Sequence, residues 1–228
     1  MVDEFCNPDN CFLYKYCIPE WRELIDIKRK IVHFKKGASI FKEGEKVNGM
    51  YFLYSGAVKV HKQWVGEKEL IIRFTKEGDI LGHRGFGTSE FYPVSATALT
   101  PSKACFITND FLETILRADH ALTFRLMQFY SLELQKAEMP MRNLALMEVK
   151  GRIAETLLEI LEVFGTDKDG HIAVPITRQD IAAYSGTTYE TVFKFLRLLT
   201  KAKTISSVGK SIKINDEKKL RGILKNAN

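Results

Sequence analysis

One stretch, TRQDIAAYSGTTYETVFKFLRLL beginning at Thr177, constrains the fold of this chain more than any other. Thr177 can cap a first helix, and Asp180 stands three positions later in a variant of the capping box. Gly186 supplies a turn, and Thr187 or Thr188 can cap a second helix whose apolar residues recur at helical spacing. This pattern predicts a helix-turn-helix, whose second helix enters a DNA major groove. A pair of ordinary amphipathic helices is the alternative.

Length and composition allow two globular domains, since 45% of the 228 residues are hydrophobic and 27% are charged. No apolar run approaches the roughly 18 residues that a membrane span needs. The segment from Met1 to Asn10 lacks the basic start and apolar core of a signal peptide. We therefore expect a cytoplasmic protein without a membrane partner. No Ser-His-Asp, P-loop, paired-carboxylate or HExxH arrangement appears, so we expect no enzyme activity.

Positive charge is concentrated near the predicted helix pair. Residues 150–228 hold 14 Lys and Arg against 9 Asp and Glu, which accounts for most of the net charge of +6. Attraction to DNA phosphates requires such a surplus. A basic surface without a partner remains the alternative.

Short β-rich runs separated by glycines occupy the chain from Ile31 to about Ile107. This texture is typical of an antiparallel barrel or jelly roll. Before it, Pro19 to Lys28 shows the spacing of a short helix, whereas Asp3 to Tyr16 has no clear periodicity.

Helical patterns return from Phe111 to about Met147, with a long helix from about Asp119. Its apolar edge can form a two-stranded dimer seam or pack on the barrel of its own chain. We expect Pro140 to kink this helix. The residues of the edge are Leu122, Leu126, Phe129, Leu132 or Glu133, Lys136, Met139, Asn143 and Leu146.

Two further elements flank the helix pair. Val149 to Phe164 is predicted to be a helix, and Gly165 to Gly170 a polar loop. After the pair, TISSVGKSIKI predicts two short strands joined at residues 208–210, the wing that often braces a helix-turn-helix.

The order of barrel, long helix, helix-turn-helix and wing resembles the CRP/FNR family of bacterial transcription regulators. GEKVNGMYFLYSGAVKV at residues 44–60 and GDILG at 78–82 are similar to the family's sensor-domain motifs. The resemblance implies an α+β fold with an N-terminal antiparallel β-roll or jelly roll of the cyclic-nucleotide-binding type, a long dimerisation helix and a C-terminal winged helix-turn-helix. We expect a sensor domain at 1–148 and a DNA-binding domain at 149–228. The implied partners are a second copy of the chain, a palindromic operator in double-stranded DNA and, for an activator, RNA polymerase.

The resemblance does not extend to the cyclic AMP site. Cyclic-AMP-binding members place a glutamate after the GDILG-like glycine and an Arg-Ser pair about ten residues later; here His83 and Tyr92-Pro93 stand near those places. These residues cannot provide an arginine fork for the phosphate and a carboxylate for the sugar, so we do not expect cyclic AMP. His83, Arg84 and Tyr92 remain candidates for an effector pocket. Side chains can fill it, or it can hold another ligand, such as heme on His83 or His33.

Cys6, Cys11, Cys17 and Cys105 are the four cysteines. In a reducing compartment they indicate a thiolate metal site or unrelated thiols rather than disulfides. CFLYKYCIP, which begins at Cys11, is similar to the C-x5-C-I-P run of the FNR branch, where it provides two ligands of an oxygen-labile 4Fe-4S cluster. The resemblance implies a 4Fe-4S cluster on all four cysteines, although four residues separate Cys6 from Cys11 where the FNR pattern has two. A four-thiolate zinc site and a thiol redox switch are alternatives.

The resemblance also assigns roles in the reading of bases. Glu190 falls on the family's cytosine-reading glutamate, and Lys194 falls on its guanine-reading arginine. Phe193 replaces a serine and either meets a thymine methyl group or packs inward, while Tyr189 can touch a base or a phosphate. The full predicted DNA-binding set is Thr177, Arg178, Thr188, Tyr189, Glu190, Phe193, Lys194 and Lys210.

Overall fold

The computed structural model describes residues 11–64, 66, 68–87 and 90–225. The chain divides into two compact units, one of Met1–Lys62 with Thr75–Gln135 and one of Gln63–Phe74 with Lys136–Asn228. No helix in the described ranges has the length and apolar character to cross a membrane.

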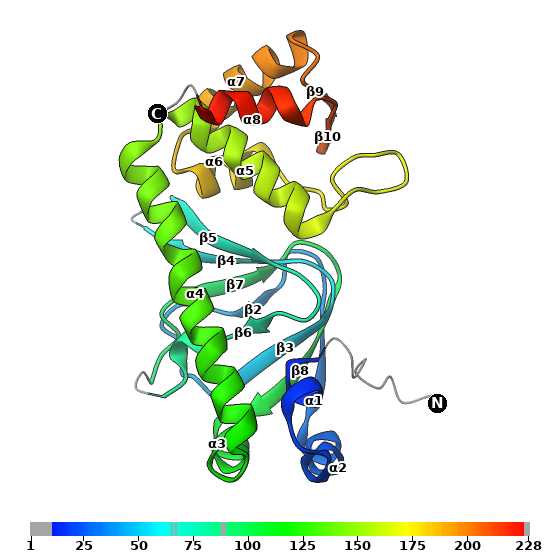
Figure 1. Cartoon of the computed structure of the whole chain (residues 1–228), viewed down its shortest axis with the longest axis vertical. Helices are drawn as coiled ribbons and strands as arrows, with labels where there is room; N and C mark the ends of the chain where they lie inside the picture. Colours follow the sequence, from blue (N-terminus) through cyan, green and yellow to red (C-terminus); the bar gives the residue numbers. More distant parts are fainter. Residues whose placement is uncertain (1–10, 65, 67, 88–89, 226–228) are drawn as a thin grey trace. The chain divides into compact units, whose positions relative to one another are not determined.

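Two antiparallel four-stranded sheets form the predicted β-roll (Figure 1). The first sheet has the order β1-β8-β3-β6, and the second has the order β2-β7-β4-β5. The all-antiparallel pairing suits a chain in which short strands follow one another through tight turns. The bounds are β1 Lys30–Phe34, β2 Ser39–Phe41, β3 Gly49–Ser55, β4 Val58–Gln63, β5 Glu69–Thr75, β6 Ile80–Leu81, β7 Ser95–Ala98 and β8 Ser102–Thr108.

The turn between β3 and β4 requires a glycine at position 56. Gly56 links β3 to β4 with a φ of +99°, a conformation that side chains with a Cβ rarely adopt. A Cβ added there would also meet the carbonyl oxygen of Pro101 and the side chain of Ser102. The turn can therefore lie against the start of β8 only without a side chain.

Helices close one end of the β-roll core. α1 Phe12–Tyr16, α2 Pro19–Lys28, α3 Asn109–Ala118 and the first half of α4 His120–Leu146 share one buried cluster with β3, β6 and β8. Ile25, Met50, Ile107, Ile115 and Leu122 are fully buried in it. The helix at Pro19–Lys28 is confirmed, whereas α1 lies in a segment for which the sequence indicated no helix.

The structure decides between the two alternatives for the first part of the predicted apolar edge of the long helix. Leu122 and Leu126 are buried in the sensor core, and Phe129 packs against that core. This part of the edge therefore packs on its own β-roll instead of forming a seam, whereas Leu132, Met139 and Leu146 farther along it are exposed. Pro140 lies inside α4 without ending it.

A different edge of α4 is exposed. Met127 and Leu134 stand seven residues apart, as do Leu134 and Met141, and all three side chains are exposed. A seven-residue repeat of apolar side chains is the pattern of a two-stranded helical seam.

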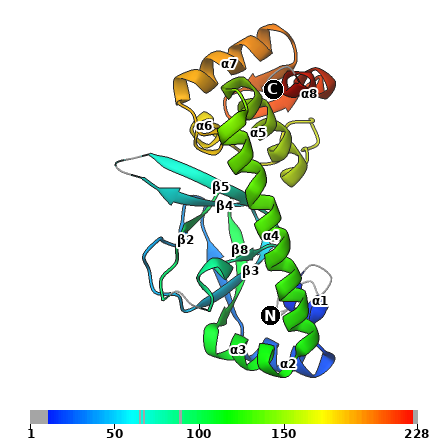
Figure 2. The ribbon, with the colours of Figure 1, turned by 60° about the vertical axis from the view of Figure 1, so that its left-hand side comes forward.

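The second unit contains the predicted winged helix-turn-helix (Figure 2). Its core is formed by apolar faces of α5 Val149–Phe164, α6 Arg178–Ser185 and α7 Tyr189–Lys201, and its wing consists of the antiparallel strands β9 Ile205–Val208 and β10 Ser211–Ile214. α8 Glu217–Lys225, which the sequence pattern did not reveal, packs against α5. Leu220 of α8 is fully buried, so this last helix completes the core.

Candidate nucleic-acid interface and sensor site

Local hydrogen bonds fix the two helices of the helix-turn-helix. The Thr177 hydroxyl accepts from the Asp180 N–H at 3.0 Å, and Asp180 Oδ2 accepts from the Thr177 N–H at 3.0 Å. The predicted capping box is therefore present. Gly186 makes the turn in the left-handed region, with φ +62°. Thr188, rather than Thr187, caps α7 by accepting from the Thr191 N–H at 3.3 Å.

Arg152 of α5 ties this turn to the preceding helix. Its Nε donates to the Ser185 carbonyl at 2.8 Å, and Nη2 donates to the Gly186 carbonyl at 3.3 Å. Nη1 donates to the Met147 carbonyl at 2.8 Å. These carbonyls end helices, where the acceptors lack helical partners and an arginine is favourable. Arg152 could not be predicted as a site residue, because a charged residue on a helix gives no local sign of a distant carbonyl.

α7 presents two different faces. Val192, Phe195, Leu196 and Leu199 are buried, whereas Tyr189, Glu190, Phe193 and Lys194 are exposed. The predicted base-reading residues thus share the outer face of the N-terminal half of α7, the part of a recognition helix that meets base edges.

Phe193 does not pack inward. Its side chain is 38% exposed and stacks on Tyr189, with ring centroids 6.2 Å apart and an interplanar angle of 12°. The guanidinium carbons of Arg178 and Arg197 lie 5.7 Å and 5.9 Å from the Phe193 ring centroid. Arg197 was missed in the sequence, although its position four residues after Phe193 places it on the same helix face.

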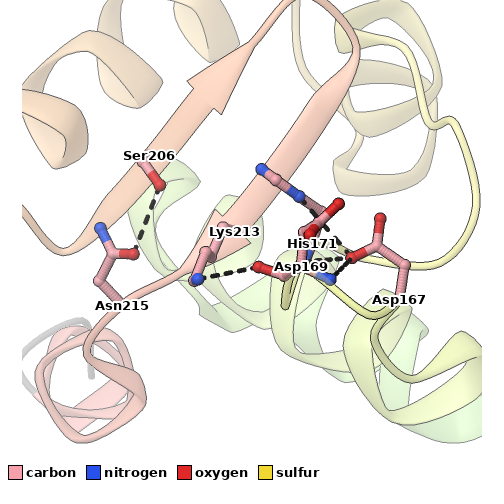
Figure 3. Close-up of polar contacts among 6 residues, drawn as sticks. All are labelled: Asp167, Asp169, His171, Ser206, Lys213 and Asn215. Atoms are coloured by element: carbon pink, nitrogen blue, oxygen red, sulfur yellow. Dashed lines mark hydrogen bonds and ion pairs between the residues drawn. The ribbon is translucent and has the colours of Figure 1, made fainter.

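The wing and the loop before α6 are joined by polar contacts (Figure 3). Lys210 is exposed in the β9–β10 turn, and Lys213 Nζ donates to the Asp169 carbonyl at 2.9 Å. Asp167 Oδ1 accepts from the backbone N–H groups of His171, at 2.8 Å, and Asp169, at 3.0 Å. These bonds, above all the one from His171, lower the pKa of Asp167. The carboxylate thereby fixes the loop.

Three of the four predicted metal ligands lie in one hydrophobic cluster. Cys11, Cys17 and Cys105 are buried there and form no disulfide, whereas Cys6 lies outside the described residues. Cys105 is on β8, opposite Phe52 of β3. Cys17 follows directly after α1.

The geometry of these thiols differs from that of a single-ion site. Across the described part of the chain, the only three ligand side chains with atoms within 4.8 Å of one another are Asp167, Asp169 and His171. Thiolates around one zinc ion lie about 3.8 Å apart, given a Zn–S bond of about 2.3 Å. Sulfurs that each bind a different iron of a cluster lie farther apart. Burial raises the pKa of the Cys17 thiol, and the Arg22 side chain opposes that shift.

The cysteine arm is attached directly to the long helix. Asp119 Oδ2 accepts from the Ile18 N–H at 2.9 Å, and its Oδ1 accepts from the Leu122 N–H at 2.9 Å. Phe12 of α1 also meets Phe129 of α4 edge to face, with ring centroids 5.9 Å apart. Asp119 is buried, whereas the sequence indicated it only as the approximate start of the long helix.

The candidate effector residues do not share one buried site. His83 begins the 3-10 helix His83–Gly85 and is buried, with Nδ1 3.2 Å from the Ile80 carbonyl and Nε2 3.8 Å from Glu133 Oε2. Tyr92 is buried and donates to the Gly49 carbonyl at 2.8 Å. Arg84 is exposed, and so is His33 on β1, which does not suit a heme ligand inside the β-roll.

Comparisons with known proteins agree with this architecture. Residues 31–119 match the model of the cyclic nucleotide-binding domain, and residues 151–223 match that of the Crp-like helix-turn-helix domain. The "Anaerobic regulatory protein" of Bacillus subtilis (strain 168) is 30% identical over 211 residues, which cover 91% of this chain and 87% of that protein. The "CRP-like cAMP-activated global transcriptional regulator" of Mycobacterium tuberculosis is 27% identical over 191 residues, covering 83% of this chain and 85% of that one.

Solved structures show the same fold. FixK2 from Bradyrhizobium japonicum aligns with a TM-score of 0.75 and 24% identity, over 86% of this chain and 96% of that one. A putative regulator from Eubacterium rectale aligns with a TM-score of 0.77 and 18% identity, over 93% and 97%. The matching domains and relatives are those of transcriptional regulators, not of enzymes. The chain belongs to the CRP/FNR family of transcriptional regulators.

Proposed function

We propose that this regulator is a cytoplasmic homodimer whose binding to a palindromic operator responds to oxygen, nitric oxide or redox state through a 4Fe-4S cluster on Cys6, Cys11, Cys17 and Cys105. The observation that carries the proposal is the hydrogen bond from Ile18, the neighbour of Cys17, to Asp119 at the start of α4. It joins the cysteine arm to the helix that can align two subunits. The relative named as an anaerobic regulator supports an oxygen-linked signal.

The donor set suits such a group. Soft thiolates are the ligands that iron-sulfur clusters prefer, and the apolar cluster around Cys11, Cys17 and Cys105 keeps water away. A cluster bound there would supply an oxygen- and nitric-oxide-labile link between the arm and the β-roll.

Contacts between the cysteine arm and α4 make the stability of the start of α4 depend on the position of the arm. One oxygen of Asp119 accepts from the Ile18 N–H, and the other caps α4 by accepting from the Leu122 N–H. Displacement of the arm therefore removes one of the two hydrogen bonds that hold this carboxylate. Phe12 packs on Phe129, and the Arg125 guanidinium lies 5.3 Å from the Tyr16 ring centroid. An ordered arm thus supports the first turns of α4 through three contacts.

The exposed edge of α4 provides the proposed dimer seam. Met127, Leu134 and Met141 repeat every seven residues, and burying them against a second copy removes apolar surface from water. A seam that shifts with the arm changes the separation of the two recognition helices, which must match about 34 Å of DNA.

The proposed operator contacts come from α7 and its flanks. Glu190 accepts from cytosine N4 and Lys194 donates to guanine, while Thr177, Arg178, Thr188 and Lys210 contact the phosphate backbone. Bound to its operator, an activator of this kind would contact RNA polymerase.

Anaerobic purification tests the sensor. Iron and sulfide analysis, with the absorption of thiolate-to-iron charge transfer, should show a cluster in wild-type protein and its loss in the Cys105→Ala variant. Operator affinity, measured by anisotropy before and after exposure to air, should fall only in the wild type. Equal operator affinity for cluster-bearing and cluster-free wild-type protein would refute the proposed sensing role of the cluster. Zinc or heme in the metal analysis, in place of iron and sulfide, would refute the 4Fe-4S cluster itself.

A further inference from the structure

The outer face of α7 carries a pair of aromatic rings that hydrogen-bonded base reading leaves unexplained. Tyr189 and Phe193 are 42% and 38% exposed and stack on one another, one helical turn apart. Exposure of a phenylalanine ring to water is energetically unfavourable. This ring lies between two residues that can reach base edges, Glu190 and Lys194.

The surroundings of Phe193 hold it on the surface. Arg178 comes from α6 and Arg197 from the next turn of α7, and both guanidinium groups lie within 6 Å of the ring centroid. The buried face of α7 is already occupied by Val192, Phe195, Leu196 and Leu199. The ring is therefore presented outward, with two positively charged side chains close by that can meet phosphates.

We infer that Phe193, supported by Tyr189, is a specificity-determining residue that recognises a thymine through its 5-methyl group. The inference rests on the proposed role of α7 as the reading helix. A phenyl ring has no hydrogen-bonding group, and the thymine methyl is the apolar group that the major groove displays.

The position of the thymine follows from helix geometry. Phe193 is three residues after Glu190, which is about 4.5 Å along a helix axis. Base pairs are spaced about 3.4 Å apart. The thymine thus lies about one or two base pairs from the cytosine that Glu190 reads.

Replacement of thymine by uracil removes only the methyl group and so tests this contact. An operator is first selected with the full-length protein from a random duplex pool, and each thymine of its half-site is then replaced singly by deoxyuridine. Wild-type affinity should fall about threefold to fourfold at one thymine near the cytosine, the effect of one buried methyl group. Phe193→Ala should bind the thymine and uracil operators equally.

Leu198→Ala is the matched control, because Leu198 is an exposed apolar residue on the same helix but outside its N-terminal half. It should keep the wild-type preference for thymine. Unchanged affinity of Phe193→Ala for random duplex shows that the domain is folded. Two outcomes overturn the inference but leave operator binding standing. In the first, wild-type protein binds every uracil-substituted operator as tightly as the thymine operator. In the second, Phe193→Ala still loses affinity on replacement of thymine by uracil. Failure to select any preferred sequence refutes the proposed operator reading itself.

Discussion

The backbone N–H of Ile18 donates to Oδ2 of Asp119 at 2.9 Å, across 101 residues of sequence. The other oxygen of the same carboxylate accepts from Leu122, in the first turn of α4. One buried side chain therefore holds both the end of the cysteine arm and the start of the long helix. Any change that moves the arm acts on that helix through this carboxylate.

Asp119→Ala should release the arm and weaken the start of α4. The substitution leaves the N–H groups of Ile18 and Leu122 without their acceptor, and loss of a cap together with a buried hydrogen bond costs about 1 to 3 kcal/mol. Urea unfolding of the cluster-free protein measures this cost. Hydrogen exchange at residues 12–18 should also become faster.

Asp119→Asn serves as its control. Asparagine keeps an oxygen that can cap α4 and is as good at this position as aspartate. The part of the lost stability that comes from the cap should therefore be restored, whereas the Ile18 N–H, which then faces the amide NH2 group, still lacks its acceptor, so the arm should exchange as fast as in Asp119→Ala. Slow exchange of the arm in Asp119→Ala would contradict the role assigned to this carboxylate.

Local signals determined which parts of the fold could be predicted. Thr177 with Asp180, and the glycine at 186, fix a helix start and a turn within a few residues, and the structure has both. The edge of α4 could not be assigned in the same way, because periodicity reveals an apolar face but not its partner. Leu122 and Leu126 therefore appeared suitable for a seam and instead pack on the β-roll.

Leu134→Glu should weaken the proposed dimer. The side chain is 67% exposed on α4, so the charge is tolerated in a single subunit, whereas in the seam it loses water. The dissociation constant of the dimer should rise about tenfold or more, which corresponds to about 1.4 kcal/mol. Sedimentation over a range of concentrations measures it.

Ile27→Glu provides the comparison, since Ile27 is an exposed apolar residue of α2 outside the seam. It should leave the dissociation constant unchanged. A Leu134→Glu protein that remains as dimeric as wild type would move the subunit interface away from this edge of α4.

Some contacts at the candidate sites could not be predicted from the sequence, because their partners lie far apart in the chain. Arg152 reaches carbonyls more than thirty residues away, and Arg178 of α6 comes beside the Phe193 ring of α7 only when the two helices pack. The sequence alone left Phe193 between two orientations because a phenylalanine at helical spacing suits either. The assignment of the four cysteines to a metal site stays a prediction, and Cys6 lies outside the described residues.

Glu159→Gln should stabilise the DNA-binding unit at neutral pH. Burial raises the pKa of Glu159, a shift that the hydrogen bond from the Tyr184 hydroxyl opposes and that nearby Glu155 and Glu162 increase. A folded-state pKa above the unfolded value means that stability falls as pH rises through that interval. Glutamine can still accept from Tyr184 without a charge, so we expect the variant to be more stable than the wild type at pH 7.

Thermal unfolding at several pH values measures this difference. The gain should vanish below the ordinary carboxyl pKa, where Glu159 is protonated in both the folded and unfolded states. A Glu159→Gln advantage of the same size at pH 3 and pH 7 would assign the effect to packing instead of charge.

Substitutions at Glu190 and Lys194 should change the preference between bases more than the overall affinity for DNA. Both are exposed on the outer face of α7 and neither supports the core. Glu190→Ala should cost about 1 to 3 kcal/mol on the cognate half-site and little on random duplex.

Lys194→Arg should sharpen discrimination for guanine, because the planar guanidinium can donate to O6 and N7 together, which an ammonium group does less specifically. Competition binding against half-sites with single base changes measures both ratios; if Glu190→Ala lowers affinity for cognate and random duplex by the same factor, Glu190 does not read a base.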